Sequence, residues 1–147
     1  MKKNKSKNIF VEGPISPVSI AESIQKHSDK TNIGGHSIFL GQVRADQIAE
    51  HQVTGIVYTA YEEMASQKMD DIREEIFKKF DLTCMHVYHS LGLVAVGEIC
   101  LFVFTSSAHR KECMQACDEL VERIKSELPI WGKEILSDES YQWKENK

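Results

Sequence analysis

Five basic residues, at four places in the sequence, could bind an anion or move a proton. Arg44 ends a predicted strand beside a loop, where binding residues are often found. His109 and Arg110 stand in the first turn of a predicted helix, and Lys125 lies near the end of the same helix. Lys133 follows on a predicted strand. Taken one at a time, a solvated Arg44 and a Lys125 that favours a helix C-terminus are ordinary surface features.

The His109-Arg110 pair conflicts with its expected surroundings. A cation at a helix N-terminus faces the positive end of the helix dipole. Helical spacing also puts both residues near the apolar face that Cys113 and Cys117 mark. Because free N–H groups in the same turn bind anions, a phosphate or carboxylate ligand would resolve the conflict. An ion pair with a nearby Glu or Asp would resolve it equally well.

The cysteines and histidines could in principle bind a metal ion. No two cysteines form a Cys-x-x-Cys pair, and a cytosolic chain would keep its cysteines reduced. His109, Cys113 and Cys117 recur at four-residue spacing on one helix face, but zinc would need a fourth ligand and exposure. We therefore interpret Cys113 and Cys117 as core residues, and predict no metal site and no cofactor. His86 and His89 are given no predicted role.

A mixture of helices and strands must position these residues. Ser16 followed by Pro17 predicts the start of a first helix. Ser106 or Ser107 should cap the last helix, which Pro129 should end. The mixture predicts an α+β fold with about three helices and a mixed or antiparallel sheet. Strands are predicted over 9–12, 36–44, 53–61, 83–89, 98–106, 130–136 and 141–143, further helices over 62–80 and about 108–127, a mobile loop over 45–51 and a turn over 90–97.

Length and composition fit one globular domain. The 147 residues are 41% hydrophobic and carry a formal net charge of −4, which argues against broad nucleic-acid binding. No apolar run reaches the roughly 20 residues that span a bilayer, and the four lysines before residue 8 precede no apolar stretch of signal-peptide length. We expect a disordered basic tail over 1–8, a single domain over 9–147, and a cytoplasmic protein that binds neither nucleic acid nor membranes.

Four segments, taken in order, resemble the large subunit of molybdopterin synthase over nearly the whole chain after the tail. They are Phe39–Arg44, Tyr58–Met64, Thr105–Arg110 and Lys125–Glu134. Each segment is short, but their order and spacing together are typical of this family. The resemblance implies an α/β-hammerhead type of α+β fold, which agrees with the predicted elements. It also implies that the large subunits pair as a dimer, which forms a heterotetramer with the small subunit.

The same resemblance implies a sulfur-transfer reaction. In the family, a small ubiquitin-like subunit carries a thiocarboxylate on its C-terminal Gly-Gly and inserts that tail into a pocket of the large subunit. Two such transfers convert cyclic pyranopterin monophosphate into the dithiolene molybdopterin, in molybdenum cofactor biosynthesis. This chain ends in Glu145-Asn146-Lys147, so it resembles the subunit that accepts the tail. Because the sulfur arrives with the partner, no cysteine of this chain is required as a nucleophile.

The resemblance also assigns roles to the basic residues. Arg44, His109 and Arg110 match the family's substrate-binding residues, and Lys125 matches its essential pocket lysine. A buried lysine could hold the incoming thiocarboxylate, stabilise developing negative charge, or donate a proton if its pKa is lowered. The sequence leaves these three roles open.

Two positions depart from the family pattern. The family usually has Trp-Lys-Lys/Arg-Glu where this chain has Trp131–Glu134 with glycine at 132, so one of the usual pocket cations is missing. Lys133 could substitute as a substrate-binding residue, but adjacent side chains on a strand point to opposite faces. The glycine could let the backbone bend enough to help. Thr59 stands where a glutamate is common before Ala-Tyr.

The spacing of the basic residues bears on assembly. His109 and Lys125 are sixteen residues apart on one predicted helix, which separates them by roughly 24 Å. One small pterin phosphate cannot easily touch both. We therefore predict a dimer with shared pockets, in which one subunit supplies Lys125 and Arg44 and the other supplies His109 and Arg110.

Two other classes of protein compete with the enzyme. A non-catalytic partner could keep the surface that binds the ubiquitin-like protein and lose the chemistry, and Gly132 and Thr59 support it. Retention of the four matching basic residues argues against it. A metal-binding module built on His109, Cys113 and Cys117 is the second alternative, and metal analysis would test it.

Overall fold

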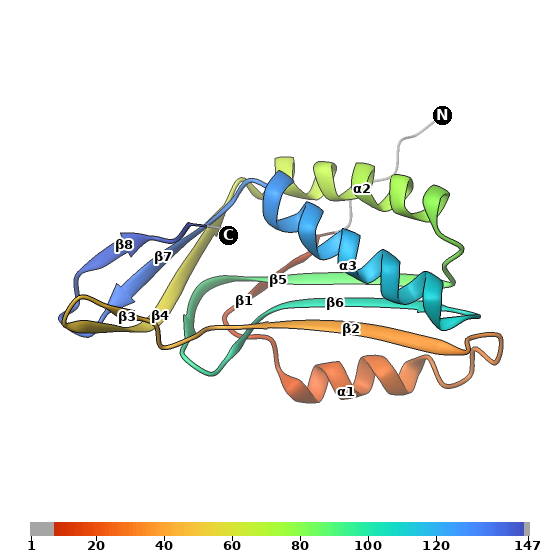
Figure 1. Ribbon diagram of the computed structural model, residues 1–147, viewed down its shortest axis with the longest axis horizontal. Helices are drawn as coiled ribbons and strands as arrows, with labels where there is room; N and C mark the ends of the chain where they lie inside the picture. Colours follow the sequence, from red (N-terminus) through yellow and green to blue (C-terminus); the bar gives the residue numbers. More distant parts are fainter. Residues whose placement is uncertain (1–7, 146–147) are drawn as a thin grey trace.

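One eight-stranded sheet and three helices make up the described part of the chain, residues 8–145 (Figure 1). In this computed structural model the helices are α1 (Pro17–Lys26), α2 (Glu62–Lys79) and α3 (Arg110–Glu127). The strands are β1 (Phe10–Glu12), β2 (Gly35–Gln42), β3 (Gln47–Ile48), β4 (His51–Ala60), β5 (Cys84–Ala95), β6 (Ile99–Ser107), β7 (Ile130–Leu136) and β8 (Tyr141–Trp143). The main strand order is β2-β6-β5-β4-β7-β8, while β1 pairs with β5 and β3 with β4. Only the β1–β5 pairing is parallel, and the prediction of an α+β fold is confirmed.

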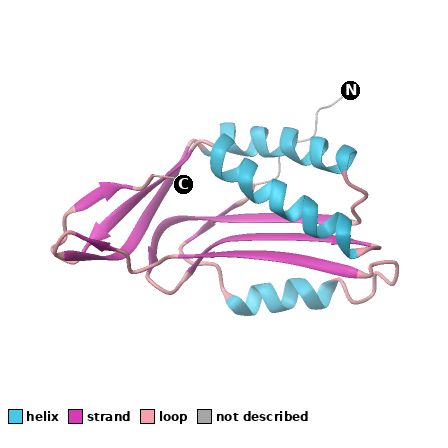
Figure 2. Cartoon of the chain, viewed as in Figure 1, coloured by secondary structure: helices cyan, strands magenta, loops and turns pink. Residues whose placement is uncertain are grey.

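The helices cover the two faces of the long strands unequally. α2 and α3 lie on one face of β2, β6 and β5, and α1 lies on the other face (Figures 1 and 2). The main core lies under α2 and α3, where Ile72, Ile76, Leu120 and Val103 are fully buried. β4, β7 and β8 extend past the ends of these helices (Figure 1). The C-terminal end of α3 therefore meets the point where the sheet leaves the helical layer.

The start of α1 follows the sequence signal. The Ser16 side chain accepts a hydrogen bond from the Val18 N–H at 3.2 Å, and Pro17 occupies the first helical position. Ile20 is the residue of α1 that becomes buried, and it packs in a smaller core cluster with Phe102 and Phe104. α1 thus rests on the face of the sheet opposite to α3.

The start of α3 differs from the prediction. His109 is the N-cap residue, with no capping hydrogen bond from its side chain. Ser107, predicted as a cap, ends β6 instead, and its hydroxyl donates to the His109 carbonyl at 2.6 Å while accepting from the Cys113 N–H at 3.0 Å. Ser106 is hydrogen-bonded to His36. The last residue of the strand, rather than a residue of the loop, therefore ties down the first turn of the helix.

Two predicted connections contain strand. The segment 45–51, expected to be a mobile loop, includes β3, which pairs with β4 as a short hairpin. The segment 90–97, expected to be a turn, continues β5 as far as Ala95. Gly92, with φ of +79°, lets the strand bend there without breaking the ladder to β4. The extension of β5 pairs with residues 55–58 of β4, which local composition does not reveal, whereas β3 is a short local hairpin of mostly polar residues that lacks a strand signal.

The basic tail predicted over 1–8 lies outside the described residues, apart from Asn8. Among residues 8–145, no helix combines the length and the apolar character needed to cross a bilayer.

Candidate active site

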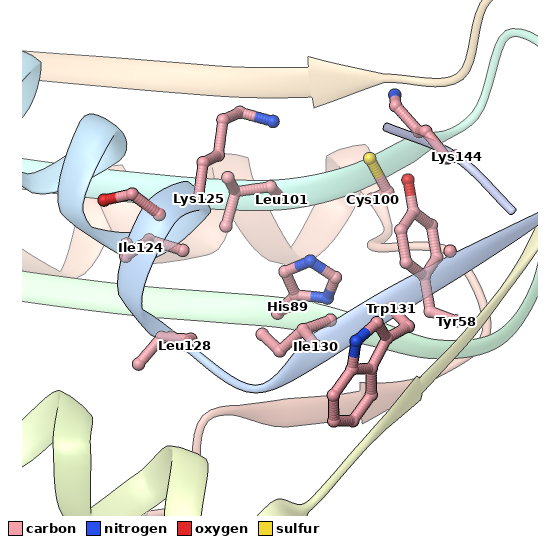
Figure 3. Close-up of a pocket in the computed structure, with 12 residues that line it drawn as sticks. Tyr58, His89, Cys100, Leu101, Ile124, Lys125, Leu128, Ile130, Trp131 and Lys144 are labelled. Carbon is pink, nitrogen blue, oxygen red and sulfur yellow. The ribbon is translucent and has the colours of Figure 1, made fainter. Parts of the chain in front are cut away.

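A cavity of about 240 Å³ lies where α3 ends and β7 begins. Its walls come from strands β4, β5, β6 and β7, from the last turn of α3 and from the segment after β8 (Figure 3). Two lysines, Lys125 and Lys144, line it, and the described lining residues include no aspartate or glutamate. The remaining lining residues are Tyr58, His89, Cys100, Leu101, Ile124, Ser126, Leu128, Ile130, Trp131 and Gly132. The cavity therefore combines two positive charges with a lining of polar and apolar side chains, a composition suited to a small anionic ligand.

Lys125 reaches this cavity from the last turn of α3 (Figure 3). The residue keeps contact with solvent, but desolvation by the surrounding protein is the largest of the causes that lower the pKa of its amine. The neighbouring charges of Lys144 and Arg44 lower that pKa further. An anion placed between these cations would relieve their repulsion, so the charge pattern favours an anionic ligand.

His89 lines the cavity from β5, although the sequence had given it no role. Its Nδ1–H donates to the Ser90 carbonyl at 2.7 Å, since a carbonyl can only accept. The pKa of His89 is lowered to about 4, mainly by burial; the Ser90 hydrogen bond opposes this shift, and the charge of Lys125 adds to it. At neutral pH the ring is therefore uncharged, with Nε2 as a hydrogen-bond acceptor. The sequence offered no sign of this role, because His89 becomes buried only when β5 packs against elements that are distant in the sequence.

Tyr58 and Cys100 form the inner wall of the cavity. Tyr58 is buried, and its ring meets that of His89 edge-on at 5.0 Å between centroids. Burial raises the pKa of Tyr58 well above its ordinary value, and the adjacent Cys100 sulfur raises it further. The phenol therefore stays protonated and can donate a hydrogen bond toward a ligand.

The second cation in the cavity is Lys144, not Lys133. The Lys144 N–H donates to the Gly132 carbonyl at 2.8 Å, so the segment after β8 lies beside Gly132 and brings Lys144 to the cavity (Figure 3). Lys133 lies next to Gly132 in β7 and is not among the lining residues, because adjacent strand residues face opposite ways. Its Nζ lies 4.7 Å above the ring of Tyr141. The expected role of Lys133 therefore gains no support from this geometry.

Gly132 leaves little room for a larger residue. A Cβ added there would lie 3.0 Å from Ile56 Cγ2 and 3.2 Å from Tyr58 Cε1. The glycine thus lets Tyr58 pack closely against β7. A lysine at position 132, as is usual in the family, would therefore require Tyr58 or Ile56 to move.

Arg44 stands near the cavity without lining it. It follows β2, and its guanidinium pairs with Asp46 at 3.2 Å while its side chain remains 75% exposed. Its charge is nevertheless among the causes that lower the pKa of Lys125. Arg44 therefore lies within electrostatic range of the cavity and could turn toward a ligand at its mouth.

His109 and Arg110 lie at the opposite end of α3 from Lys125. They line a separate open hollow of about 630 Å³ with Gly34, Ala108 and Lys111. Because α3 is one continuous helix from Arg110 to Glu127, Arg110 and Lys125 are separated by roughly 22 Å along its axis. The structure thus brings Arg44 near Lys125 and keeps His109 and Arg110 away from it within one chain.

Comparisons of sequence point to one family. A model of the MoaE protein family matches residues 12–127. The chain is 36% identical over 139 residues to the molybdopterin synthase catalytic subunit of Pyrococcus abyssi, covering 95% of this chain and 91% of that protein. It is 35% identical over 133 residues to the molybdopterin synthase catalytic subunit of Drosophila melanogaster. That match covers 89% of this chain but 36% of the longer insect protein.

Solved structures share the same fold. The molybdopterin synthase of Staphylococcus aureus superposes with a TM-score of 0.82 at 29% identity, covering 95% of this chain and 97% of the other. A complex of subunits 1 and 2 of molybdopterin-converting factor from Helicobacter pylori gives a TM-score of 0.78 at 17% identity, covering 94% and 90%. At the lower identity the likeness concerns the fold alone.

Proposed function

The chain belongs to the MoaE family of molybdopterin synthase catalytic subunits, and we propose that sulfur transfer takes place in the cavity of Lys125. The donor is the thiocarboxylate at the C-terminus of a ubiquitin-like small subunit. The acceptor is cyclic pyranopterin monophosphate, which becomes the dithiolene molybdopterin after two transfers. The observation that carries this proposal is a cavity lined by two lysines and, among its described residues, by no acidic side chain.

Lys125 has the properties that the reaction needs. Its ammonium can hold a thiocarboxylate or a phosphate as a point charge. Because the cavity is partly shielded from water, a positive charge there stabilises developing negative charge more strongly than it would in solution. The lowered pKa of Lys125 also makes proton donation easier than for an ordinary lysine. We assign Lys125 the first of these tasks, the electrostatic hold on the thiocarboxylate, and Lys144 the support of the same anion.

An exposed apolar rim beside the cavity suits the partner's tail. Trp131 lines the cavity and is 45% exposed, and its ring meets Tyr61 edge-on at 5.1 Å between centroids. Tyr61 and Met64 are more exposed still and share a shallow hollow. Large aromatic and methionine side chains at a surface are typical of protein interfaces. We place the incoming C-terminal tail across this rim, with its thiocarboxylate at Lys125.

A second copy of the chain completes the site. The distance along α3 keeps His109 and Arg110 out of their own Lys125 cavity. In a two-fold dimer, the same residues of one copy can reach the cavity of the other. We therefore place Lys125, Lys144 and Arg44 of one subunit opposite His109 and Arg110 of its partner. With two small subunits the assembly is a heterotetramer.

We also propose that the protein works in the cytoplasm. All four of its cysteines are free and buried. Free thiols are typical of proteins that remain in a reducing compartment.

Reconstitution tests this function. The purified chain is mixed with a thiocarboxylated small subunit and cyclic pyranopterin monophosphate, and molybdopterin is measured. We expect product from the wild type and a loss of more than about 100-fold in Lys125→Ala, as for removal of one oxyanion-stabilising group. Lys78→Ala is the matched control. Lys78 also lies in the last turn of a helix, but that helix is α2, which contributes no residue to the cavity.

A non-catalytic partner protein gives a different result. It would bind the small subunit stably and yield no product with wild-type protein. Gly132→Lys would then be the reversion to examine, although its Cβ would lie 3.0 Å from Ile56 Cγ2. The reversion therefore needs Ile56 or Tyr58 to move, and a recovered activity would have to be matched by an intact fold.

A further inference from the structure

A second cluster of reactive side chains lies on the other face of the sheet from the Lys125 cavity. Cys84 and His86 are two residues apart on β5, so both project toward the face that α1 covers. His27, the C-cap residue of α1, faces them from the helix. One ligand atom from each of the three lies within 4.8 Å of the others. This is a different set from the helix residues His109, Cys113 and Cys117, which the sequence had suggested.

The two histidines are oriented as a metal ion requires. His27 Nδ1 donates to the Ser23 carbonyl at 2.7 Å, so the lone pair of its Nε2 points from the other side of the ring toward His86. That Nε2 accepts a hydrogen bond from Nε2 of His86 at 3.1 Å, so the His86 proton must leave Nε2 before both rings can bind one ion. Two imidazole nitrogens on one tetrahedral zinc ion are separated by roughly 3.4 Å, so a small movement of either ring would admit an ion. The carbonyl behind His27 is the kind of second partner that orients metal-bound histidines.

The surroundings of the cluster favour a cation. His27 caps the C-terminus of α1, where the helix dipole is negative. The Lys30 ammonium donates a hydrogen bond to Cys84 Sγ at 3.1 Å, so a cation already contacts the sulfur. Lys30 is exposed, and its long side chain can turn to solvent when an ion takes that place.

An ion can reach the cluster from solvent. His27 and His86 line a cavity of about 550 Å³ between α1 and the sheet, together with Ser23, Tyr88 and Phe102. Cys84 and His27 are themselves buried. The protein thus offers three ligands from two elements and leaves a fourth coordination position toward this cavity, which water could fill.

We propose that His27, Cys84 and His86 form a binding site for a divalent metal ion of the zinc class. Two imidazoles and one thiolate are a borderline-soft donor set, which suits zinc and not magnesium or calcium. The bound ion links the end of α1 to β5, two elements that are separated by 57 to 59 residues in the sequence. This site is independent of the Lys125 cavity and of the sulfur-transfer reaction.

Cobalt and zinc titrations of the purified chain test the site. We expect one equivalent of Co²⁺ to give the visible bands of tetrahedral coordination and a sulfur-to-cobalt charge-transfer band. Zn²⁺, added in competition with a chromophoric chelator, should displace the cobalt. Cys84→Ser should remove the charge-transfer band. His27→Gln should weaken zinc binding by about 100-fold or more, which exceeds the usual effect of removing a residue that only orients a metal ligand.

Matched variants separate this site from adventitious binding. Cys117→Ser removes a buried cysteine from α3, and His51→Gln removes a histidine far from α1, so both should bind the ions as the wild type does. A wild-type titration without a charge-transfer band would overturn the proposal without reference to any variant. So would a band that persists in Cys84→Ser, or one that Cys117→Ser abolishes.

Discussion

Lys125 is exposed, but two other cations lie near it and the surrounding protein removes part of its hydration. Lys144 and Arg44 both lower its pKa, after desolvation. Like charges brought together at a partly buried place cost free energy unless an anion joins them. The site therefore has a reason to bind a thiocarboxylate or a phosphate before any chemistry begins.

The structure predicts different effects on activity for substitutions of Lys144 and of Lys133. Lys144 lines the cavity, whereas the amine of Lys133 lies over the ring of Tyr141. Lys144→Ala should lower kcat/KM for molybdopterin formation by about 10- to 100-fold, since one hydrogen bond to a charged group contributes roughly 1.5–3 kcal/mol. Lys133→Ala should stay within about two-fold of the wild type. Steady-state kinetics of both variants decide the matter, and a larger loss in Lys133→Ala would refute the assignment.

His89 should make stability depend on pH. Its pKa is about 4 in the folded chain and 6.5 in the unfolded one, so the unfolded chain binds the extra proton between these values. The free energy of unfolding therefore has its full value, with respect to His89, above pH 6.5. It falls by about 3 kcal/mol in total as the pH is lowered from 6.5 to 4. Urea unfolding across this range should show a flatter profile for His89→Gln than for the wild type. His109→Gln, at an exposed position, should keep the wild-type slope; equal slopes for all three proteins would contradict the burial of His89.

At the scale of the elements, some boundaries could be predicted because their causes are local. Ser16 and Pro17 place the start of α1, and the apolar residues of β6 indicate a strand inside the sheet, where it lies between β2 and β5. The hairpin of β3 and the second half of β5 could not be predicted, since their pairing depends on β4. Local signals fix an element only where the chain supplies its own cap or period.

Only some residues of the candidate site could be predicted from the sequence. Lys125 and Arg44 came from the family resemblance and lie at or near one cavity. Lys144 was missed because it reaches the cavity only through the pairing of its N–H with Gly132. His89 was missed because its neutral state comes from burial beneath distant elements. Such features follow from tertiary packing, which a single sequence does not display.

Two adjacent glycines, Gly34 and Gly35, test how tightly the chain at the start of β2 packs against the start of α3. A Cβ at Gly34 would overlap the carbonyl oxygen of Ala108, a backbone atom that cannot turn aside, whereas a Cβ at Gly35 would lie no closer than 3.5 Å to its neighbours. Gly34→Ala should therefore lower the free energy of unfolding by more than about 2 kcal/mol, and Gly35→Ala by less than about 0.5 kcal/mol. Chemical denaturation measures both. Equal losses would mean that the two backbones are not held in contact.

At the scale of the whole molecule, the position of the basic residues implies a shared site. α3 holds Arg110 and Lys125 roughly 22 Å apart in one chain, and a rigid helix cannot shorten that distance. A two-fold partner can bring a second α3 to the same cavity. The proposed dimer would thus let residues at both ends of one helix contact one small substrate.

Mixed dimers test this account most directly. Two differently tagged chains are co-expressed, the mixed dimer is purified, and molybdopterin formation is measured with the thiocarboxylated small subunit. A dimer with Lys125→Ala in one chain and Arg110→Ala in the other should have about half of the wild-type activity, because one of its two shared sites keeps both residues. A dimer of wild type with the double variant should be inactive, because each shared site lacks one residue.

The reverse pattern, with activity only when both substitutions lie in the same chain, would place the site within one subunit and contradict the account.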